Sequence, residues 1–398
     1  MNYLNKKTIE DIDIAHKKVL LRCDFNVPII DGKITDDRRI TESLKTINYL
    51  INNHAKIILC SHLGRPKGVF SEEFSLKPVA KRLSELLETP IAMATDVVGT
   101  SAQTLAADLK DGEIMLLENV RFCKEETEND DEFSKKLASL VEVYINDAYG
   151  VSHRAHSSTC GVAKYLPSAI GFLMLKELSI MDKAINSPSR PFISILGGAK
   201  VSDKIGVIYS LLNKVDILIL GGGMAYTFAR ARGLNIGTSL CEEDKLDIAR
   251  EVMKEAKEKG VTLLMPVDFV VASAFSNDAD FKTVDETEIP NDYMGMDIGP
   301  KSVELFSNEI RKAIGGTIIW NGPMGVCEFK NFEKGTKALA QVIAETNLVS
   351  VIGGGDSAAA VKQMGLSDKM THISTGGGAS LKLLEGVDLP AVVAIQDK

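Results

Sequence analysis

The stretch FISILGGAKVSDKI, residues 192–205, decides how we divide this chain. It opens with an apolar run that predicts a buried strand and turns at Gly197 and Gly198, after which we predict a helical segment. In such a helix, Lys200 and Lys204 would lie four residues apart on one face. Five of the six histidines precede this stretch, and all three Gly-Gly-Gly triplets follow it. We therefore expect a second lobe to begin here, with an anion held at its first turn.

Strand–glycine–helix units of the same kind recur through the second half of the chain. The later ones read DILILGGGMAYTFARA (216–231), LVSVIGGGDSAAAVKQM (348–364) and HISTGGGASLKLLEG (372–386). Glycine lets the backbone approach a phosphate closely, and the N–H groups of the following helix supply donors and partial positive charge. Four such turns in one lobe, one of them bearing two lysines, favour a polyphosphate ligand, which indicates a nucleotide.

The motifs narrow the kind of nucleotide site. No GxxxxGK[ST] occurs, so the chain is not a Walker-A NTPase. Residues 353–358 satisfy the GxGxx[GA] pattern of dinucleotide folds, but the next strand ends in Ser374-Thr375-Gly376, without the acidic residue that such a fold expects. A carboxylate at Asp356 would also repel a pyrophosphate unless Mg²⁺ lay between them. An NAD-dependent dehydrogenase therefore remains only an alternative.

In the first half, predicted strands alternate with predicted helices. Each predicted strand is the first part of a segment that continues into a loop. The segments are KVLLRCDFNVP (18–28), KIILCSHLGRP (56–66), EIMLLENVRF (113–122) and VYINDAYG (143–150). Helical periodicity is clearest over residues 39–54 and 173–187. This alternation predicts a mostly parallel sheet with helices on both faces, in which ligands bind beyond the carboxyl ends of the strands.

Polar residues gather at those predicted strand ends. They are Asp24, Asn26, His62, Arg65, Arg121, His153, Arg154 and His156. Arginine binds phosphate or carboxylate oxygens bidentately, so we predict a shared anion site. Asp24 and Asn26 either contact a ligand hydroxyl or orient an arginine, and the residues alone leave both roles open. His153 and His156 have the spacing of a metal pair, but no acidic third ligand is near, so we predict no metal there.

Composition limits the class of protein. A chain of 398 residues suggests two domains, and a net charge of −8 argues against general binding to nucleic acids. The six cysteines are scattered, which favours a reducing, intracellular setting. We find no signal-peptide pattern and no apolar run of about 18 residues, so we expect no membrane association and a cytoplasmic protein.

Taken together, the motifs resemble those of the phosphoglycerate kinase family, in one order from about residue 4 to 396. They are RCDFNVP, DDRRI, SHLGRPKG, LLENVRF, NDAYGVSHRAHSST, GGAKVSDKI, GGGMAYTF, WNGPMGVCE, GGGDSAAA and STGGGASLKLLEG. The chain departs mildly from the usual family residues at Cys23, Tyr149, Cys327 and Lys382. None of these changes removes a charged group from the site, although Cys327 precedes Glu328 and could affect nucleotide affinity.

The resemblance implies an α/β fold of two Rossmann-like three-layer (α/β/α) lobes with mostly parallel sheets, joined by an interdomain helix and hinge. It implies a phosphoglycerate-binding lobe over residues 1–172, a connecting helix over 173–188 and a nucleotide-binding lobe over 189–380. Residues 381–398 are expected to return to the first lobe.

The resemblance also implies a reaction and its residues. The activity is reversible, Mg-dependent phosphoryl transfer between 1,3-bisphosphoglycerate and ADP, giving 3-phosphoglycerate and ATP, in a protein that is mainly monomeric. The implied substrate-binding residues are Asp24, Phe25, Asn26, Arg39, His62, Leu63, Gly64, Arg65, Arg121 and Arg154. The implied nucleotide-binding residues are Gly198, Lys204, Gly221, Gly222, Gly295, Asn321, Pro323, Glu328, Gly353, Gly354, Gly355, Asp356 and Ser357. Those implied around the moving phosphoryl group are Arg39, Lys200, Gly376 and Gly377, with Asp356 holding Mg²⁺.

The acceptor in the ATP-consuming direction is a carboxylate, which is already ionised at neutral pH, so no general base is expected. Catalysis would then rest on positioning and charge stabilisation after the two lobes close. A catalytically silent nucleotide-binding protein is the non-enzymatic alternative. The intact set of Arg39, Lys200, Lys204 and Asp356 argues against it.

Overall fold

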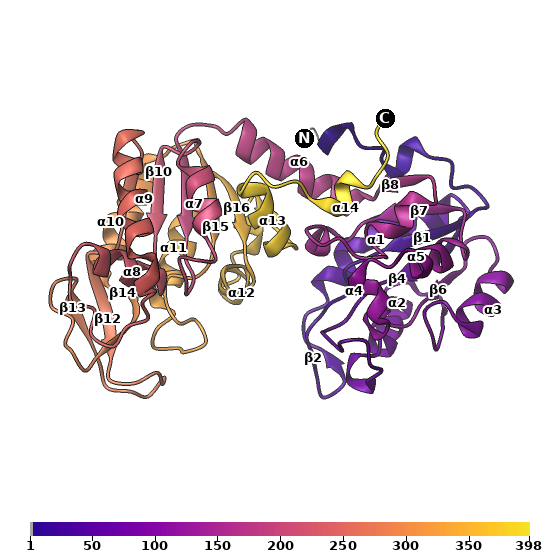
Figure 1. Ribbon diagram of the computed structural model, residues 1–398, viewed down its shortest axis with the longest axis horizontal. Coiled ribbons are helices and arrows are strands. Elements are labelled where there is room, and N and C mark those ends of the chain that lie inside the picture. Colours follow the sequence, from indigo (N-terminus) through magenta and orange to yellow (C-terminus); the bar gives the residue numbers. More distant parts are fainter. Residues whose placement is uncertain (1–2) are drawn as a thin grey trace. The chain divides into compact units, whose positions relative to one another are not determined.

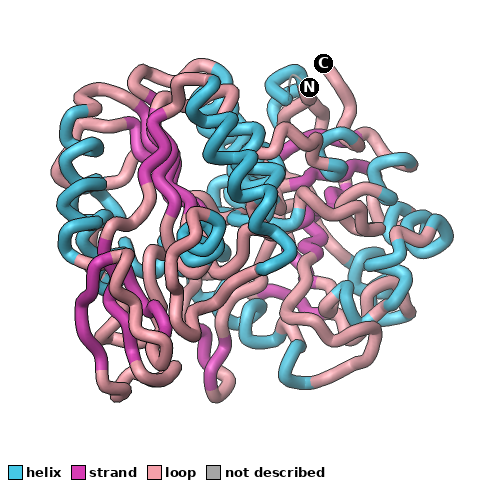
Figure 2. The backbone as a smooth tube through the Cα atoms, turned by 60° about the vertical axis from the view of Figure 1, so that its left-hand side comes forward, coloured by secondary structure: helices cyan, strands magenta, loops and turns pink. Residues whose placement is uncertain are grey.

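The order of strands in two parallel sheets determines where ligands can bind. The computed structural model describes residues 3–398, and its internal contacts divide the chain into two units. The first comprises the residues up to Ser179 together with Asp388–Lys398, and the second comprises Ile180–Val387. Each unit contains a six-stranded sheet in which all neighbouring strands are parallel, with helices flanking it (Figure 1, Figure 2).

The sheet of the first unit has the order β5-β6-β4-β1-β7-β8. Its strands are β1 Lys18–Arg22, β4 Lys56–Cys60, β5 Ile91–Met93, β6 Ile114–Leu116, β7 Val143–Asn146 and β8 Ser168–Ile170. The chain leaves β1 toward β4 and later returns on the other side of β1 with β7. At such a reversal the connecting loops diverge and leave a crevice beyond the carboxyl ends of the strands. The crevice of the first unit therefore lies beyond β1 and β7.

The sheet of the second unit has the order β11-β10-β9-β15-β16-β17. Its strands are β9 Phe192–Leu196, β10 Ile217–Leu220, β11 Thr262–Leu264, β15 Thr317–Asn321, β16 Val349–Gly353 and β17 His372–Ile373. Counted along the chain this is the Rossmann order 3-2-1-4-5-6, which reverses between its first and fourth strands. Here these strands are β9, the strand of the FISIL segment, and β15.

Helices connect the parallel strands. In the first unit they are α1 Arg38–Asn52, α2 Lys77–Leu87, α3 Thr100–Asp108, α4 Lys124–Glu128, α5 Asp131–Ala138 and α14 Pro390–Val393. Helix α6, Phe172–Asn186, begins in the first unit and ends in the second. The second unit contains α7 Ile205–Leu211, α8 Met224–Ala231, α9 Leu246–Glu258, α10 Pro300–Lys312, α11 Lys334–Ala344, α12 Gly355–Gln363 and α13 Gly377–Leu384.

Shorter elements occupy the loops. The 3-10 helices are η1 Tyr3–Asn5, η2 Ile9–Asp11, η3 Glu72–Phe74, η4 Val120–Phe122, η5 Tyr149–Val151, η6 Gly161–Lys164, η7 Glu243–Lys245 and η8 Ser367–Lys369. Strands β2 Ile29–Ile30 and β3 Lys33–Ile34 form a hairpin. The second unit also has an antiparallel sheet of β12 Asp268–Ala272, β13 Phe281–Asp285 and β14 Met294–Ile298, in the order β13-β12-β14.

Both faces of each parallel sheet are buried, as continuous apolar strands require. On one face of the first sheet, Val19 and Leu21 of β1 pack with Ile40 and Ile47, which share one side of α1. Leu20 points to the other face and is also fully buried. The predicted fold class, two Rossmann-like α/β lobes with mostly parallel sheets, is thus confirmed, whereas the hinge stays a prediction.

The chain ends are joined within the first unit. The Nζ of Lys6, a buried residue, donates to the carbonyl of Ile395 at 2.7 Å and lies 2.9 Å from a carboxylate oxygen of Asp397. A β-bridge also joins Lys6 to Asp397. By contact, residues 388–398 belong to the first unit, while the bounds of the predicted segment 381–398 stay a prediction.

The prediction of a helix directly after Gly197-Gly198 is wrong. Residues 198–204 form a loop, and α7 begins only at Ile205. Gly198 has a φ of 116°, which breaks the helical path, and Ser202 is held outside the helix by two hydrogen bonds to the Glu242 carboxylate. Lys200 is exposed and Lys204 is buried, so the two lysines do not share a helical face.

Candidate functional site

A cavity of about 210 Å³ lies at the reversal point of the first sheet. Its lining combines loops that follow β1, β4, β6 and β7 with the first turn of α1, and helix α1 supplies Arg39. The lining residues are Asp24, Asn26, Arg39, His62, Gly64, Arg65, Arg121, Gly150, Val151, His153 and Arg154. The predicted gathering of arginine and histidine at one sheet edge is therefore present in the structure.

The cavity has a strongly positive lining. Four arginines face it, and Asp24 is the one acidic residue among its lining residues in the described chain. Asp24 forms an ion pair with Arg39, which leaves the other three guanidinium groups in excess. Burial, together with nearby Arg22 and Arg154, lowers the pKa of Arg121 to about 10. Such crowding of cations is favourable only when an anion shares the cavity, which points to a ligand with several negative charges.

The loop after β4 is held by hydrogen bonds from the other loops. The Gly64 N–H donates to Oδ1 of Asn26 at 2.8 Å, and its carbonyl accepts from Arg121 at 2.7 Å. Gly64 has a φ of 60°, and a Cβ there would collide with the ring of Phe74. In the structure Asp24 is paired with Arg39 and Asn26 accepts from a backbone amide, while contact of either residue with a ligand hydroxyl stays a prediction.

Two predicted substrate residues do not line the cavity. Phe25 is fully buried and Leu63 is 4% exposed, and both side chains belong to the hydrophobic core. Phe25 is fixed there by its backbone N–H, which donates to Ser61 Oγ at 2.8 Å. Their side chains therefore anchor the two loops in the hydrophobic core, and any contact with a ligand would come from their backbone atoms.

Sequence reasoning missed two lining residues, Gly150 and Val151, which follow β7 in η5. His153 also lines the cavity, as the predicted anion site expected, although the residues implied by the family resemblance did not include it. A Cβ on Gly150 would collide with the carboxylate of Asp24, so only glycine fits there. The signal was the GVSH stretch directly after a predicted strand end, but its contact with Asp24 required knowledge of the strand order.

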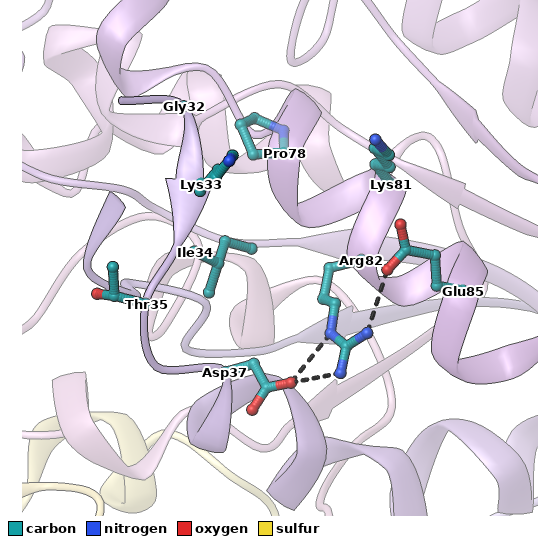
Figure 3. Close-up of a pocket in the computed structure, with 9 residues that line it drawn as sticks. All are labelled: Gly32, Lys33, Ile34, Thr35, Asp37, Pro78, Lys81, Arg82 and Glu85. Carbon is teal, nitrogen blue, oxygen red and sulfur yellow. Dashed lines mark hydrogen bonds and ion pairs between the residues drawn. The ribbon is translucent and has the colours of Figure 1, made fainter. Parts of the chain in front are cut away.

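A second cavity, of about 440 Å³, lies in the first unit between the β2–β3 hairpin and α2 (Figure 3). Its Arg82 already binds Asp37 at 2.8 and 3.0 Å and Glu85 at 3.1 Å. The one arginine of this cavity is thus paired with both of its carboxylates, and Ile34 contributes an apolar wall. Despite its size, this cavity lacks the excess positive charge of the smaller one.

In the second unit, glycine-rich loops meet at the reversal between β9 and β15. The Gly197 N–H donates to the carbonyl of Asn321 at 2.9 Å, and the Gly198 N–H donates to that of Pro323 at 3.2 Å. A Cβ on Gly197 would collide with the Pro323 carbonyl, and one on Gly221 would collide with the Met324 sulfur. Gly197 is needed because two backbones are in contact there, and Gly221 is needed because the Met324 side chain packs against it.

Lys204 and Asn321 lie together under these loops. The buried Nζ of Lys204 donates to Oδ1 of Asn321, and burial lowers the pKa of Lys204 to about 8. Asn321 is 3% exposed, and its Nδ2 has no hydrogen-bond partner among residues 3–398. Gly353 and Gly354 pass directly over this amide, since a Cβ on either would lie 3.0 or 3.6 Å from it. A buried lysine and an unsatisfied amide donor form a site suited to an anion.

The starts of α12 and α13 adjoin this pair. A Cβ on Gly377 would lie 3.1 Å from the backbone of Gly354, and Gly376 is the N-cap of α13. Asp356 is exposed in the first turn of α12. Ser357 is fully buried, and its Oγ accepts from the Gly322 N–H at 2.9 Å, so its side chain supports the loop.

The other predicted nucleotide residues lie farther along the loops. Gly295 belongs to β14, where a Cβ would collide with the ring of Tyr226, and its N–H donates to Ser239 Oγ at 2.8 Å. Glu328 is exposed in the loop after β15. The hydrogen bond of Gly295 thus goes to Ser239, whereas that of the Lys204 side chain goes to Asn321.

The donors available for a metal are few. Among residues 3–398 there is no group of three or more His, Cys, Asp or Glu side chains that could hold a metal ion. Asp356 is a single exposed carboxylate beside the glycine loops. One carboxylate fits Mg²⁺, which commonly takes one or two protein carboxylates and completes its shell with phosphate oxygens and water. In the same residues, no helix has the length and apolar character needed to cross a membrane.

The family model described as "Phosphoglycerate kinase" matches residues 9–387. A phosphoglycerate kinase of Clostridium novyi (strain NT) is 58% identical over 398 residues, covering 99% of this chain and 100% of that protein. One of Clostridium botulinum (strain Langeland) is 56% identical over 401 residues, covering all of both chains. The solved phosphoglycerate kinase of Coxiella burnetii is similar at a TM-score of 0.86, with 40% identity and 98% of both chains covered.

Proposed function

The chain belongs to the phosphoglycerate kinase family, and from that premise we propose how its residues carry out the reaction. It is an enzyme of the kinase class of transferases that acts in glycolysis on small-molecule substrates, one of them a nucleotide. The reaction moves a phosphoryl group reversibly between 1,3-bisphosphoglycerate and ADP, giving 3-phosphoglycerate and ATP. The Rossmann strand order of the second unit would also suit a dehydrogenase, and family membership decides against that alternative.

We propose that the phosphoglycerate binds in the cavity of the first unit. The observation that carries this assignment is the cavity with four arginines and one acidic residue. A ligand with both a phosphate and a carboxylate would supply the missing negative charge at two points. Arginine forks suit both groups, while Asn26 and His62 offer hydrogen bonds to the ligand hydroxyl and carboxylate oxygens.

The nucleotide phosphates belong, in this proposal, to the glycine loops of the second unit. Lys204 and the unsatisfied Nδ2 of Asn321 would meet phosphate oxygens, with backbone donors from residues 353–357. The ribose and base would extend toward Gly295, Pro323 and Glu328. Asp356 would hold Mg²⁺, which, when bound, neutralises phosphate charge.

The chemistry needs stabilisation of charge but no proton abstraction. The attacking group in the ATP-consuming direction is an ionised carboxylate, so its oxygen forms the new O–P bond as the bond to the departing ADP oxygen breaks. Arg39 and Lys200 would neutralise the oxygens of the moving group, and the α13 start at Gly376 and Gly377 would add N–H donors. Since the two ligands belong to different units, the proposal includes a closing movement about residues 173–188.

A coupled assay with ATP, Mg²⁺ and 3-phosphoglycerate tests the activity, and absence of turnover would favour a catalytically silent nucleotide-binding protein. Calorimetry with each ligand tests the assignment to separate sites. We expect 3-phosphoglycerate to bind without nucleotide and to lose affinity when Arg121 or Arg154 is replaced by alanine, while Mg-ADP affinity stays unchanged. Equal loss of both ligands would overturn the separate sites. We further propose a monomeric, cytoplasmic enzyme, which size-exclusion chromatography with light scattering and cell fractionation would test.

A further inference from the structure

Arg22 lies directly behind the proposed substrate cavity without lining it. It is the last residue of β1 and is paired in register with Cys60 of β4, two residues before His62. Its side chain is fully buried, although an arginine is seldom buried without a specific partner. The proposed reaction gives Arg22 no role, so its contacts need a separate explanation.

Each part of the Arg22 guanidinium has an acceptor. Its Nε donates to Ser158 Oγ at 2.8 Å, and its Nη1 donates to the carbonyl of Cys23. Ser158 in turn donates from Oγ to Glu126 at 2.6 Å and from its backbone N–H at 2.9 Å. Glu126 is fully buried. Although burial favours its protonated form, His156, Arg22 and Ser158 hold the pKa of this carboxyl below its usual value. Glu126 and Ser158 thus fix the position of Arg22.

The remaining nitrogen, Nη2 of Arg22, lies 3.3 Å from Nδ1 of His62. Arginine can only donate, so Nδ1 of the imidazole must be the acceptor. A neutral imidazole has one donor and one acceptor, which leaves the hydrogen of His62 on Nε2. An imidazolium would instead direct an N–H toward the guanidinium.

The charges around His62 favour the same state. His62 is 2% exposed, and burial, with Arg22, Arg121 and Arg39 adding to it, holds its pKa well below the usual value. The opposing group is Asp24, whose Oδ1 lies 3.9 Å from Nδ1, beyond hydrogen-bond distance. Asp24 is already paired with Arg39, and nearby His156 is turned toward Glu126 at 3.6 Å.

We propose that Arg22 is a positioning residue that fixes His62 as the neutral tautomer with its hydrogen on Nε2. His62 lines the cavity, so this hydrogen serves as a fixed donor to an oxygen of the bound phosphoglycerate. The neutral ring supplies a hydrogen bond of fixed direction, and it adds no further positive charge to a site that already has four arginines. This role rests on the proposed function for its ligand, but the tautomer itself does not.

The tautomer can be measured on the ligand-free protein. Long-range ¹H–¹⁵N correlation spectra of the six histidine rings, assigned with His62→Gln, should show His62 with its hydrogen on Nε2 and no titration from pH 6 to 8. In Arg22→Gln, whose amide can donate or accept, we expect mixed tautomers. In Ser158→Ala, which keeps the guanidinium but removes one anchor, we expect a smaller change in the same direction. A wild-type spectrum with the hydrogen on Nδ1, or with a charged ring at pH 7, would overturn the proposal even if Arg22→Gln and Ser158→Ala do not fold.

The consequence for the ligand is tested by two substitutions of His62. Glutamine places an amide near the position of Nε2, whereas asparagine places it near that of Nδ1. We expect His62→Asn to raise the KM for 3-phosphoglycerate about tenfold more than His62→Gln, with a smaller effect on kcat. Equal KM values would overturn the donor role. Failure of wild-type protein to bind 3-phosphoglycerate would refute the proposed function and leave the tautomer result intact.

Discussion

The two units share one architecture, but they differ in the groups that they offer to an anion. In the first unit, charged side chains converge on a cavity. Glycine there mainly leaves space for these side chains, as Gly150 does for Asp24. In the second, glycine backbones contact one another and leave a single buried lysine and one unsatisfied amide, Lys204 and Asn321. A parallel sheet reversal supplies the crevice in both cases, so the fold does not dictate the chemistry. The choice between side-chain charge and backbone amides is made by the loops.

The largest effect on kcat should come from removing one cation from either unit. We expect Arg39→Ala and Lys200→Ala each to lower kcat by about 100-fold, because each would stabilise charge on the transferring group. Steady-state kinetics would measure this, with Lys81→Ala, an exposed lysine of α2, as the control. Near-normal turnover of Lys200→Ala would remove it from the mechanism and leave the transfer to the first unit's arginine.

The backbone contacts between the glycine loops of the second unit can be disrupted by adding one methyl group. Gly222 and Gly365 both have a φ of 67°, but only the Cβ on Gly222 would meet backbone, 2.6 Å from the Gly198 nitrogen. We expect Gly222→Ala to raise the KM for nucleotide about thirtyfold by shifting the loop. Gly365→Ala should lower stability by a similar strain of about 1–2 kcal/mol without changing this KM. Kinetics and thermal unfolding of the pair would separate strain from loop displacement, and equal KM values would contradict the loop argument.

Asp356→Asn should weaken the apparent affinity for Mg-nucleotide about tenfold, since a neutral amide is a poorer ligand for Mg²⁺. The affinity for 3-phosphoglycerate should stay unchanged. Titration calorimetry with each ligand provides both the measurement and its control. A matched loss of both would mean that Asp356 supports the chain as a whole.

A smaller effect should appear with pH. Lys204 has a pKa lowered by burial to about 8, so it is charged at pH 7 and largely neutral at pH 9.5. Nucleotide affinity should fall about fivefold over this range, and Lys204→Arg, which stays protonated, should not show the fall. Above pH 8, binding should take up a proton, which calorimetry in buffers of different ionisation enthalpy detects. No proton uptake would contradict the contact between Lys204 and phosphate.

The same lysine affects stability with a definite sign. Between about pH 8 and its ordinary value of 10.5, the unfolded chain binds the proton that the folded chain has lost. Its contribution to stability should therefore rise with pH across this window. Denaturant unfolding of wild type against Lys204→Met would reveal the contribution as a difference in slope, and parallel curves would contradict it.

The smallest effect should come from the larger cavity. Arg82→Gln breaks a partly exposed ion pair with Asp37 at the start of α1, and such pairs contribute about 0–1 kcal/mol. We expect less than about a twofold change in the KM for 3-phosphoglycerate. A larger change in the assay would show that the cavity of Figure 3 supports Arg39 through α1.

The sequence predicted those parts of the molecule that depend on local pattern. Alternating strands and helices predicted both parallel sheets, and polar residues after strand ends predicted the cavity around Arg121. The antiparallel sheet was missed because the pairing of Phe269 with Val284 and Ile298 joins segments with no short turn signal. Family resemblance correctly named the enzyme class, while the assignment of individual site residues stays a prediction.

The errors share a physical cause, which is that neighbours distant in sequence decide local form. The stretch with Lys200 has a helical pattern, but Gly198 turns it and Glu242 holds it as a loop. Phe25 lies within a motif that suggests contact with a ligand, but its side chain packs in the hydrophobic core. The donor state of His62 depends on Arg22, forty residues away, and no spacing rule could predict it.

The joined chain ends of the first unit bear on how the protein is synthesised. The residues that supply acceptors to Lys6, including Ile395, leave the ribosome after the residues of the second unit. The second unit, Ile180–Val387, is continuous and has all its residues before these emerge. The first unit is therefore begun before the second but completed after it, and translation stopping short of residue 388 would leave the first unit without residues 388–398.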